Sequence, residues 1–362
     1  MTSSLKSGWV LKPLLEVATL QRGYDLPVQN RTHGNVPIFA ANGPVGDHNE
    51  AKVSGPGVVT GRSGSIGKVH YVEADYWPLN TSLYVKNFHG NNPKFIYYLL
   101  STLGLEKYAE GTGVPTLNRN NVHGVEIPLP PLPEQKRIAA ILDKADSIRR
   151  KRQEAVRLTE ELLRSVFLDM FGDPVTNPKG WETILLGKHT KKIGSGATPT
   201  GGESAYKETG ISLIRSMNVH DGEFIYKNLA YIDEVQAEKL ANVTVEDNDV
   251  LLNITGASVA RVCRVPSKVL PARVNQHVSI IRPRSKLNPV FLEHLLLSGS
   301  VKKGLLQLSG GGATREAITK AQIEELKIIC PPIDIQNMYS DQVAVIEKMN
   351  DFASHATLEI EN

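Results

Sequence analysis

The length and composition of the chain indicate a folded protein of more than one domain. It has 362 residues, of which 41% are hydrophobic and 22% are charged, and its formal net charge is +3. This length exceeds one ordinary compact domain, so we expect two domains with connecting segments. No stretch approaches the roughly 18 consecutive apolar residues that span a membrane. We therefore expect a cytoplasmic protein without a membrane partner.

The distribution of charge is more informative than its total. Every part of the chain is slightly basic except the C-terminal end after residue 331, which is acidic. Modest positive charge suits a protein that must release DNA of the wrong sequence, because attraction to phosphates strengthens binding without discriminating between sites. An ordinary protein surface explains the same charge equally well.

An internal repeat organises the sequence. Trp9 in SGWVLKPLLEV matches Trp181 in KGWETILLGKH, and VVTGRSGSIGKVHYV (58–72) resembles LLNITGASVARVCRV (251–265). Further along, NTSLYVK (80–86) matches NQHVSII (275–281) and GTGVPTLNRN (111–120) matches GGGATREAIT (310–319). The last match pairs VEIPLPPLPEQ with LKIICPPIDIQ. Since the order is preserved, we predict two copies of one domain.

Each copy has the pattern of a mixed α/β domain. Short β-branched and aromatic runs between Gly, Pro and Asn predict strands of an irregular sheet. One apolar helix is expected in each copy, over residues 94–108 and 290–308, and each begins near a proline.

A long helix is predicted after each copy. The first follows the proline-rich segment 128–133, covers 133–171 and ends at Gly172. Apolar residues repeat every seven positions along it, as in a coiled coil with polar interruptions. These two series are Ile141, Ile148, Ala155 and Leu162, and Ile138, Ala145, Arg152, Thr159 and Val166. The second helix covers 334–360, with its apolar series at Ile335, Met338, Gln342, Val345, Met349, Phe352, Ala356 and Ile360.

If the two long helices pair, they must be antiparallel, because the second leaves the second domain and returns toward the first. The predicted fold class is α+β, with two repeated mixed α/β domains separated by an antiparallel coiled coil. The domains are then related by a pseudo-two-fold rotation, which suits a two-part duplex target. The basic run from Arg149 to Arg152 either faces acidic residues of the second helix (Asp341, Glu347, Asp351) or is a solvated helix face.

Motifs for chemistry are weak. GRSGSIGK (61–68) has the wrong glycine spacing for a phosphate loop, and GSGATP (194–199) lacks the third glycine of a dinucleotide site. Glu50-Ala51-Lys52 and Glu325-Leu326-Lys327 match half of a nuclease motif, but such triplets are common by chance. Cys263 and Cys330 lack C-x-x-C spacing, so we expect buried core cysteines and no metal site. We expect no cofactor and no catalytic residue.

The segment 127–182, from IPLPPLPEQ to NPKGWE, resembles the central conserved region of type I restriction-modification specificity subunits. With the two repeated halves, the resemblance covers essentially the whole chain. It implies recognition domains at 1–130 and 173–331, a spacer helix at 131–172, and a pairing helix at 332–362. It also implies that each domain reads one half of an interrupted site in double-stranded DNA. By the same resemblance, the helices dock two methyltransferase subunits and motor-nuclease subunits join afterward, so methyl donor, magnesium and ATP belong to those partners.

Candidate DNA-binding residues follow from side-chain chemistry, since Arg, Lys, Asn, Gln, Ser and Thr read base edges and phosphates. In the first domain they are Arg62, Ser63, Ser65, Lys68, Asn80, Thr112, Thr116, Asn118 and Arg119. In the second domain they are Arg215, Asn218, Asn253, Thr255, Ser258, Arg261, Asn275, Gln276, Thr314 and Arg315. For each residue the alternative is a turn residue or a solvent-facing polar group.

Two other functions are compatible with these patterns. A free-standing DNA-modifying enzyme would bind a methyl donor by itself. A coiled-coil scaffold would show no salt-dependent binding to duplex DNA.

Overall fold

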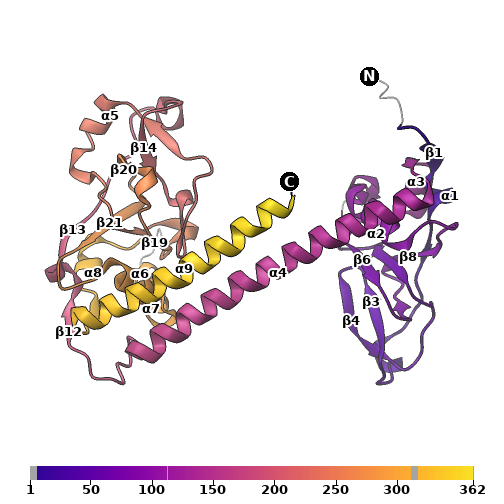
Figure 1. Ribbon diagram of the computed structural model, residues 1–362, viewed down its shortest axis with the longest axis horizontal. Coiled ribbons are helices and arrows are strands. Elements are labelled where there is room, and N and C mark those ends of the chain that lie inside the picture. Colours follow the sequence, from indigo (N-terminus) through magenta and orange to yellow (C-terminus); the bar gives the residue numbers. More distant parts are fainter. Residues whose placement is uncertain (1–5, 112, 311–316, 362) are drawn as a thin grey trace. The chain divides into compact units, whose positions relative to one another are not determined.

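A computed structural model describes the backbone of residues 6–111, 113–310 and 317–361, and side chains as far as residue 349. The chain divides into two compact units, Met1–Arg150 and Lys151–Asn362. Helix α4 (Leu132–Phe171) begins in the first unit and ends in the second (Figure 1).

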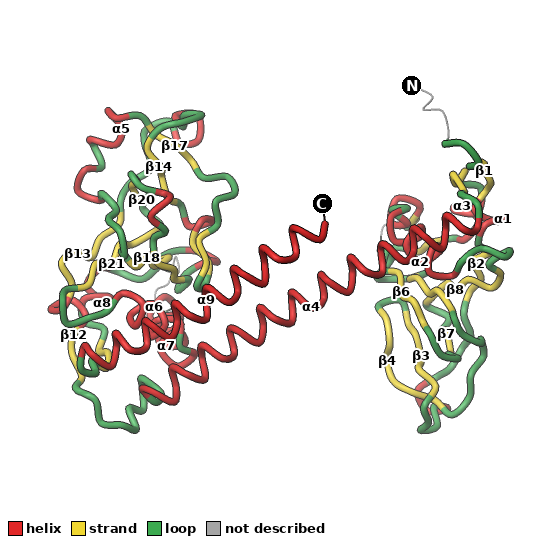
Figure 2. The backbone as a smooth tube through the Cα atoms, viewed as in Figure 1, coloured by secondary structure: helices red, strands yellow, loops and turns green. Residues whose placement is uncertain are grey.

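In the part that the structure describes, the first unit contains short strands, three α-helices and two 3-10 helices besides the start of α4 (Figure 2). Its strands are β1 (Val10–Pro13), β2 (Thr19–Arg22), β3 (Val36–Ala40), β4 (Gly43–His48), β5 (Gly57–Gly61), β6 (Val69–Val72), β7 (Trp77–Pro78), β8 (Ser82–Asn87), β9 (Ala109–Glu110), β10 (Thr116–Leu117) and β11 (Glu126–Leu129). Its α-helices are α1 (Leu14–Val17), α2 (Pro93–Thr102) and α3 (Arg119–His123), and short 3-10 helices cover Val28–Asn30 and Leu105–Tyr108.

The second unit has the same kind of content. Its strands are β12 (Thr183–Leu185), β13 (Thr190–Ser195), β14 (Ile211–Ile214), β15 (Val219–His220), β16 (Glu223–Phe224), β17 (Ala230–Ile232), β18 (Val250–Asn253), β19 (Val262–Arg264), β20 (Ala272–Val274), β21 (Val278–Pro283) and β22 (Lys327–Ile329). Its α-helices are α5 (Glu234–Glu238), α6 (Pro289–Leu297), α7 (Gly299–Ser309), α8 (Lys320–Glu324) and α9 (Ile333–Glu361). Its 3-10 helices cover Leu186–His189, Gly202–Ala205, Ser216–Asn218, Ala241–Val243, Gly256–Ser258 and Ser267–Val269.

The two units have the same sheet topology. A four-stranded antiparallel sheet has the order β2-β8-β5-β6 in the first unit and β13-β21-β18-β19 in the second. A three-stranded sheet of order β4-β3-β7 corresponds to β17-β14-β20, and each contains one parallel pair. The pair β1-β11 corresponds to β12-β22. The predicted duplication into two mixed α/β domains is therefore correct.

Strand register corrects the alignment of the two copies in three places. Gly61 lies opposite Ser82 and Asn253 opposite Val278, so Val59 corresponds to Leu251, whereas the sequence match paired Val58 with Leu251. Asn118 and Thr319 both cap the helix that follows, so these two residues correspond. The match of 111–120 with 310–319 is therefore wrong by two residues at this point. In the third place, Ser82 corresponds to Val278, because they lie opposite Gly61 and Asn253. Two residues earlier, Asn80 therefore corresponds to Gln276 and not to Asn275. Loops of unequal length hide these shifts in the sequence.

The apolar helix of each domain begins as predicted but ends earlier. Asn92 and Asn288 cap α2 and α6, and a proline occupies the first turn of each helix. The first ends at Thr102, before Gly104 takes the left-handed conformation (φ +68°). The second breaks at Ser298, which has an extended backbone, so the expected helix 290–308 is two helices.

A buried glutamine attaches each long helix to its domain. The Oε1 atom of Gln135 accepts from Asn92 N at 2.9 Å, and its Nε2 atom donates to Pro130 O at 2.9 Å. The Oε1 atom of Gln336 accepts from Asn288 N at 2.9 Å, and its Nε2 atom donates to Pro331 O at 2.7 Å. Both side chains are buried. The two long helices therefore have equivalent joints, and their bounds agree with the prediction to within one residue.

Helices α4 and α9 run in opposite directions in the second unit, where the ring of Tyr339 contacts Phe167 and Phe171 at centroid distances of 5.5 and 5.3 Å (Figure 1). The predicted heptad series are wrong in detail. Among the described side chains, the buried apolar positions of α9 are Tyr339 and Val343, because this helix packs on its own domain as well as on α4. Predicted seam residues on both helices are instead exposed, namely Ile141, Leu162, Met338, Gln342, Val345 and Met349. Phe352, Ala356 and Ile360 lie beyond the described side chains.

The ion pairs of α4 favour the solvated-face alternative for its basic run. Arg149 and Arg150 pair with Asp146 of the same helix, whereas Glu347 of α9 pairs with Arg264 of β19. Exposed pairs within one helix contribute little to stability.

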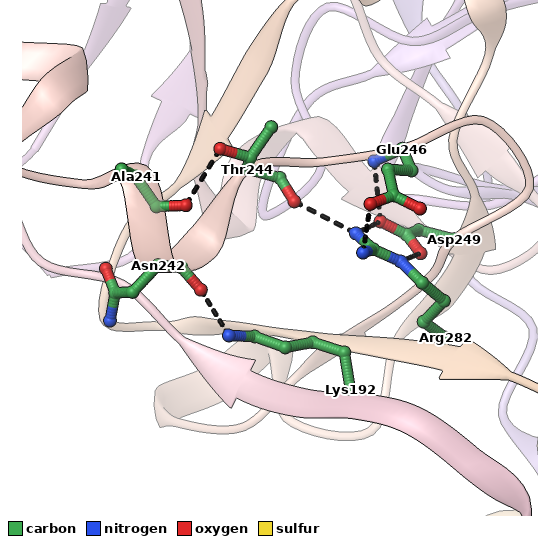
Figure 3. Close-up of polar contacts among 7 residues, drawn as sticks. All are labelled: Lys192, Ala241, Asn242, Thr244, Glu246, Asp249 and Arg282. Atoms are coloured by element: carbon green, nitrogen blue, oxygen red, sulfur yellow. Dashed lines mark hydrogen bonds and ion pairs between the residues drawn. The ribbon is translucent and has the colours of Figure 1, made fainter.

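A polar network fixes the loop before β18 to strand β21 of the four-stranded sheet in the second unit (Figure 3). Both carboxylate oxygens of Asp249 accept from the guanidinium of Arg282, at 2.7 and 2.8 Å, and the same guanidinium binds Glu246 and Thr244 O. Asp249 is fully buried, so this bidentate pair satisfies a charge that would otherwise be costly to bury. Nearby, Lys192 donates to Asn242 O. This cluster is therefore structural.

Cys263 and Cys330 are buried free thiols, as expected. Burial is the main cause that raises the pKa of both thiols. None of the described helices is long and apolar enough to cross a membrane.

Candidate nucleic-acid interface

In the first domain, three segments meet where strand β5 ends. Arg62 N and Ser63 N both donate to Thr81 O, at 2.9 and 3.1 Å. Leu117 N donates to Arg62 O at 2.7 Å, and Ser63 forms a β-bridge with Thr116. The first candidate surface is defined here as the loop 62–68, residues 80–81 and residues 116–119. Eight of the predicted residues therefore lie on these three neighbouring segments: Arg62, Ser63, Ser65, Lys68, Asn80, Thr116, Asn118 and Arg119.

Some side chains of this surface have local partners. Arg62 Nη1 donates to Asn80 O at 3.3 Å, and Asn80 Nδ2 donates to Asp25 Oδ1. Asn118 accepts from Asn120 N at 3.0 Å as a helix cap, and Thr116 Oγ1 donates to Val114 O at 3.4 Å. These bonds position the side chains and leave further donors and acceptors for a ligand.

Other side chains of the surface have no such partner. Ser63, Ser65, Lys68 and Arg119 form no side-chain hydrogen bond with another residue that the structure describes. Lys68 and Arg119 are exposed. Burial, and secondarily the charge of Arg119, lowers the pKa of His123, whose Nε2 atom accepts from Leu20 N at 3.1 Å.

The second domain forms an equivalent junction. Ile318 N donates to Ile254 O at 2.8 Å and Ile254 N donates to His277 O at 3.0 Å, while Thr255 forms a β-bridge with Ala317. Thr255 Oγ1 lies 2.5 Å from His277 Nδ1, and Gln276 Nε2 lies 3.0 Å from His277 Nε2. The second candidate surface is defined as residues 254–261, 276–277 and 317–319, with Thr198. Of the predicted residues, it contains Thr255, Ser258, Arg261 and Gln276.

Three predicted DNA-binding residues are structural instead. Asn218, Asn253 and Asn275 are 0%, 0% and 4% exposed. The amide of Asn218 donates to Ile225 O at 2.8 Å, that of Asn253 donates to Ser216 O at 2.9 Å, and Asn275 Oδ1 accepts from His277 N at 3.0 Å. Because these buried amides already bond backbone groups, we leave all three out of the candidate surface.

The predicted arginines of the second domain differ in their surroundings. The Arg215 side chain is only 15% exposed, pairs with Glu203 at 3.3 Å and donates to Asn228 O at 2.6 Å. Arg261 is half-buried, and its Nη1 atom lies 3.4 Å from His220 Nε2. Arg261 therefore remains available to a ligand, whereas Arg215 holds its own loop together. Thr112, Thr314 and Arg315 lie outside the described residues.

Sequence reasoning missed Asp25, Thr198 and His277. Thr198 Oγ1 donates to Gln276 Oε1 at 2.5 Å, which places it beside a predicted residue. Asp25 contacts Asn80 in the first domain. Asp25 and Thr198 each lie two residues after the glycine that follows the first strand of their sheet. This shared position was the only signal in the sequence that could have identified them. No group of three or more metal-ligating side chains occurs among the residues that the structure describes.

Two copies of one mixed α/β domain, each with a polar junction at the same strand ends and a long helix attached, define a duplicated protein of α+β class. The family model for the type I restriction modification DNA specificity domain matches residues 6–158 and 178–362. The chain belongs to this family.

Individual relatives share about a quarter of the aligned residues with this chain. The type I restriction enzyme MjaVIII specificity subunit of Methanocaldococcus jannaschii is 24% identical over 263 residues, which are 68% of this chain and 60% of the relative. The EcoBI specificity subunit of Escherichia coli is 26% identical over 302 residues, 75% of this chain and 61% of the relative. The match thus spans less than two thirds of these relatives.

The fold is also that of a solved specificity subunit. The crystal structure of the type I restriction-modification system S subunit from M. genitalium matches 100% of this chain and 95% of its own, with a TM-score of 0.70 and 14% identity. At this identity the likeness concerns the fold alone.

Proposed function

We propose that this chain is the sequence-reading subunit of a type I restriction-modification complex, and that each of its domains reads one half of an interrupted site in duplex DNA. The recognition domains are 1–130 and 173–331, the spacer helix is 131–172, and 332–362 is the helix that pairs with it. The observation that carries the proposal is the duplicated junction, in which Ser63 meets Thr116 and Thr255 meets Ala317. Two equivalent polar surfaces in one chain suit a target with two parts.

Candidate contacts to DNA are the accessible polar residues of the two candidate surfaces. In the first domain they are Arg62, Ser63, Ser65, Lys68, Asn80, Thr116, Asn118 and Arg119. In the second domain they are Thr255, Ser258, Arg261 and Gln276. Replacing Arg62 by Ala should weaken binding by about 1–3 kcal/mol and relax specificity if its guanidinium reads a base. Unchanged affinity would remove this loop from the interface.

The long helices are proposed to dock two methyltransferase subunits, and motor-nuclease subunits join through them. Apolar side chains remain exposed along both helices, including Val156 at 44%, Leu162 at 50% and Met349 at 68%. Exposed apolar residues at helical spacing are typical of protein interfaces. In this proposal the chain is not an enzyme, and methyl donor, magnesium and ATP belong to its partners.

Exchange of one domain tests the proposal most directly. Replacing residues 1–125 by the matching segment of a relative should change one half of the methylated site and leave the other half intact, because the two domains have separate cores. The measurement is methylome sequencing of cells that carry the exchanged chain. A change in both halves would refute independent reading by the two domains.

The isolated chain separates this proposal from the two alternatives. It should bind duplex DNA with an affinity that falls as salt rises, and it should neither methylate nor cleave that DNA. Methyl transfer by a partner-free preparation would favour a free-standing enzyme, and absent DNA binding would favour a scaffold.

The spacer helix gives a second test. Seven residues inserted after Arg152 make almost two full helical turns, so they nearly preserve the facing of the helix and add roughly 10 Å to its length. At roughly 3.4 Å per base pair, the unspecified gap should widen by about three base pairs while both half-sites stay the same. A two-residue insertion should instead weaken assembly. An active enzyme that keeps the original gap would exclude the helix as the ruler.

A further inference from the structure

Asn80 and Gln276 occupy equivalent positions in the two domains, and two independent counts give this result. Leu79 N donates to Phe39 O at 2.8 Å and Asn275 N donates to Ile214 O at 3.0 Å, each at the end of the parallel strand pair. The residue that follows the donor is Asn80 in the first domain and Gln276 in the second. Separately, Ser82 and Val278 are the first residues of β8 and β21 and lie opposite Gly61 and Asn253. Counting back two residues from each again gives Asn80 and Gln276.

The partner of each amide also occupies an equivalent position. Arg22 pairs with Leu83 and Ser195 pairs with Ser279, so Gly23 corresponds to Gly196. A Cβ atom on Gly23 would lie 2.3 Å from Leu79 O, and one on Gly196 would lie 1.9 Å from Val274 O. Only glycine permits this close passage of the loop. Two residues later, Asp25 and Thr198 reach the amides of Asn80 and Gln276.

In the first domain, the chemistry of the partner fixes the orientation of the amide. The Asp25 carboxylate only accepts hydrogen bonds, so it selects the Nδ2 end of Asn80. Arg22 lies 3.5 Å from Asp25 and supports the carboxylate. One N–H and the Oδ1 atom of Asn80 remain unused by these contacts.

In the second domain, two side chains hold the amide. Thr198 Oγ1 donates to Gln276 Oε1 at 2.5 Å, and Gln276 Nε2 lies 3.0 Å from His277 Nε2. Since the amide nitrogen only donates, His277 accepts through Nε2 and directs its Nδ1–H to Thr255 Oγ1, 2.5 Å away. One N–H and one lone pair of Gln276 remain, and the side chain is exposed.

We infer that Asn80 and Gln276 are the paired base-reading amides of the two domains, each selecting adenine, and that Asp25, Thr198 and His277 are their positioning residues. An amide with one free donor and one free acceptor matches the N7 acceptor and N6 donor of adenine in the major groove. Orienting the amide beforehand lowers the entropic cost of binding and removes the choice between its two orientations. This inference rests on the proposed function and adds the residues and base to it.

The test is selection of bound sequences from a pool of randomised duplexes by the full-length chain, assembled with its methyltransferase subunits. Asn80→Ala should reduce the preference for adenine at one position of one half-site by about tenfold or more, with the other half-site unchanged. Gln276→Ala should do the same in the opposite half-site. The unaffected half-site reports that the chain is folded, and Asn49→Ala and Gln307→Ala, two exposed amides elsewhere in the same domains, should change neither half.

The positioning residues have conservative controls. Thr198→Val should weaken the same base preference as Gln276→Ala, whereas Thr198→Ser keeps the hydroxyl and should restore it. Asp25→Asn keeps the size but adds a donor, so it should weaken the preference set by Asn80.

The outcomes separate this inference from the proposed function. If the wild-type chain selects a two-part sequence and both alanine variants select the same one, the inference is wrong and the proposed function stands. If the position affected by either variant is not adenine, the assignment of the base is wrong. If the wild-type chain selects no sequence, both are overturned.

Discussion

In the first domain, helix α2 meets strand β6 through two tyrosines, whereas the same place in the second domain contains a buried ion pair. Tyr71 and Tyr97 pack edge to face with a centroid distance of 6.0 Å. Tyr71 lies opposite Val58 in the sheet, just as Arg264 lies opposite Val250, and Tyr97 and Glu293 each lie five residues after the cap of their helix. Arg264 contacts Glu293, whose side chain is 3% exposed.

The difference continues into the long helices. Tyr98 donates to Asp143 of α4 at 2.8 Å, and Lys94 lies 4.0 Å from the centre of the Tyr71 ring and 3.2 Å from Asp143. In the second domain, Arg264 pairs with Glu347 of α9 at 2.9 Å, and His294 packs on Tyr339. The fold therefore determines where the helix meets the strand, but different side chains can make the contact. At this position only the second domain has a buried charged residue, Glu293.

Removing one partner of that ion pair should have the largest effect. Burial raises the pKa of Glu293, and the neighbouring Arg264 opposes this shift. Arg264→Ala should lower the free energy of unfolding by about 3–5 kcal/mol, because the carboxyl group loses its partner. Urea unfolding at pH 7.5 measures the loss.

The double variant Arg264→Met, Glu293→Leu is the control, and it should lose less than the single variant because no charge remains buried. In the first domain, Tyr71→Phe retains the ring contacts and should change stability by less than about 0.5 kcal/mol. A loss below about 1 kcal/mol for Arg264→Ala would show that the pair is not important for stability.

Acid should destabilise the second domain through His294. Burial first, and then the charge of Arg264, lowers the pKa of His294 from 6.5 to about 4. The unfolded chain then binds the proton more readily than the folded chain, so stability is lost as the pH falls from above 6.5 toward 4. The loss from this group by pH 5 should be about 2 kcal/mol. His294→Gln should remove this part of the pH dependence, which urea unfolding at pH 7.5 and pH 5 measures; an unchanged difference between the two pH values would exclude His294 as its source.

The two glutamine joints should have smaller and equal effects. Gln135→Ala and Gln336→Ala each leave backbone groups unpaired, at a cost of about 1–3 kcal/mol per variant. Hydrogen exchange of the amides at residues 92 and 288 should increase in the matching variant only. Gln153→Ala and Gln342→Ala, on exposed positions of the same helices, are the controls. An effect in only one domain would mean that the joints are not equivalent.

Much of the fold could be predicted from the sequence, because the repeat, the strand runs and the ends of the long helices depend on local pattern. A proline near the start of each apolar helix predicted where it begins, and the structure adds the capping residues Asn92 and Asn288. The heptad series failed because periodicity shows that one face is apolar but not what covers it, and in α9 Tyr339 and Val343 pack on the domain. Polar residues of loops were predicted as a group, and Asn218, Asn253 and Asn275 could not be told from Gln276, since burial of an amide depends on distant strands.

The glutamine joints have a consequence for how such chains can change by recombination. On the domain side, the contacts of Gln135 and Gln336 include main-chain groups: Asn92 N and Pro130 O in one joint, and Asn288 N, Lys286 O and Pro331 O in the other. Main-chain groups are the same whatever side chains the domain carries, provided that its backbone keeps this path. A foreign domain can therefore keep the main-chain part of this attachment, whereas the side-chain contacts of Asp143 with Tyr98 and of Glu347 with Arg264 must be matched anew. The two candidate surfaces lie apart from these joints and can diverge while the glutamine attachment is inherited unchanged.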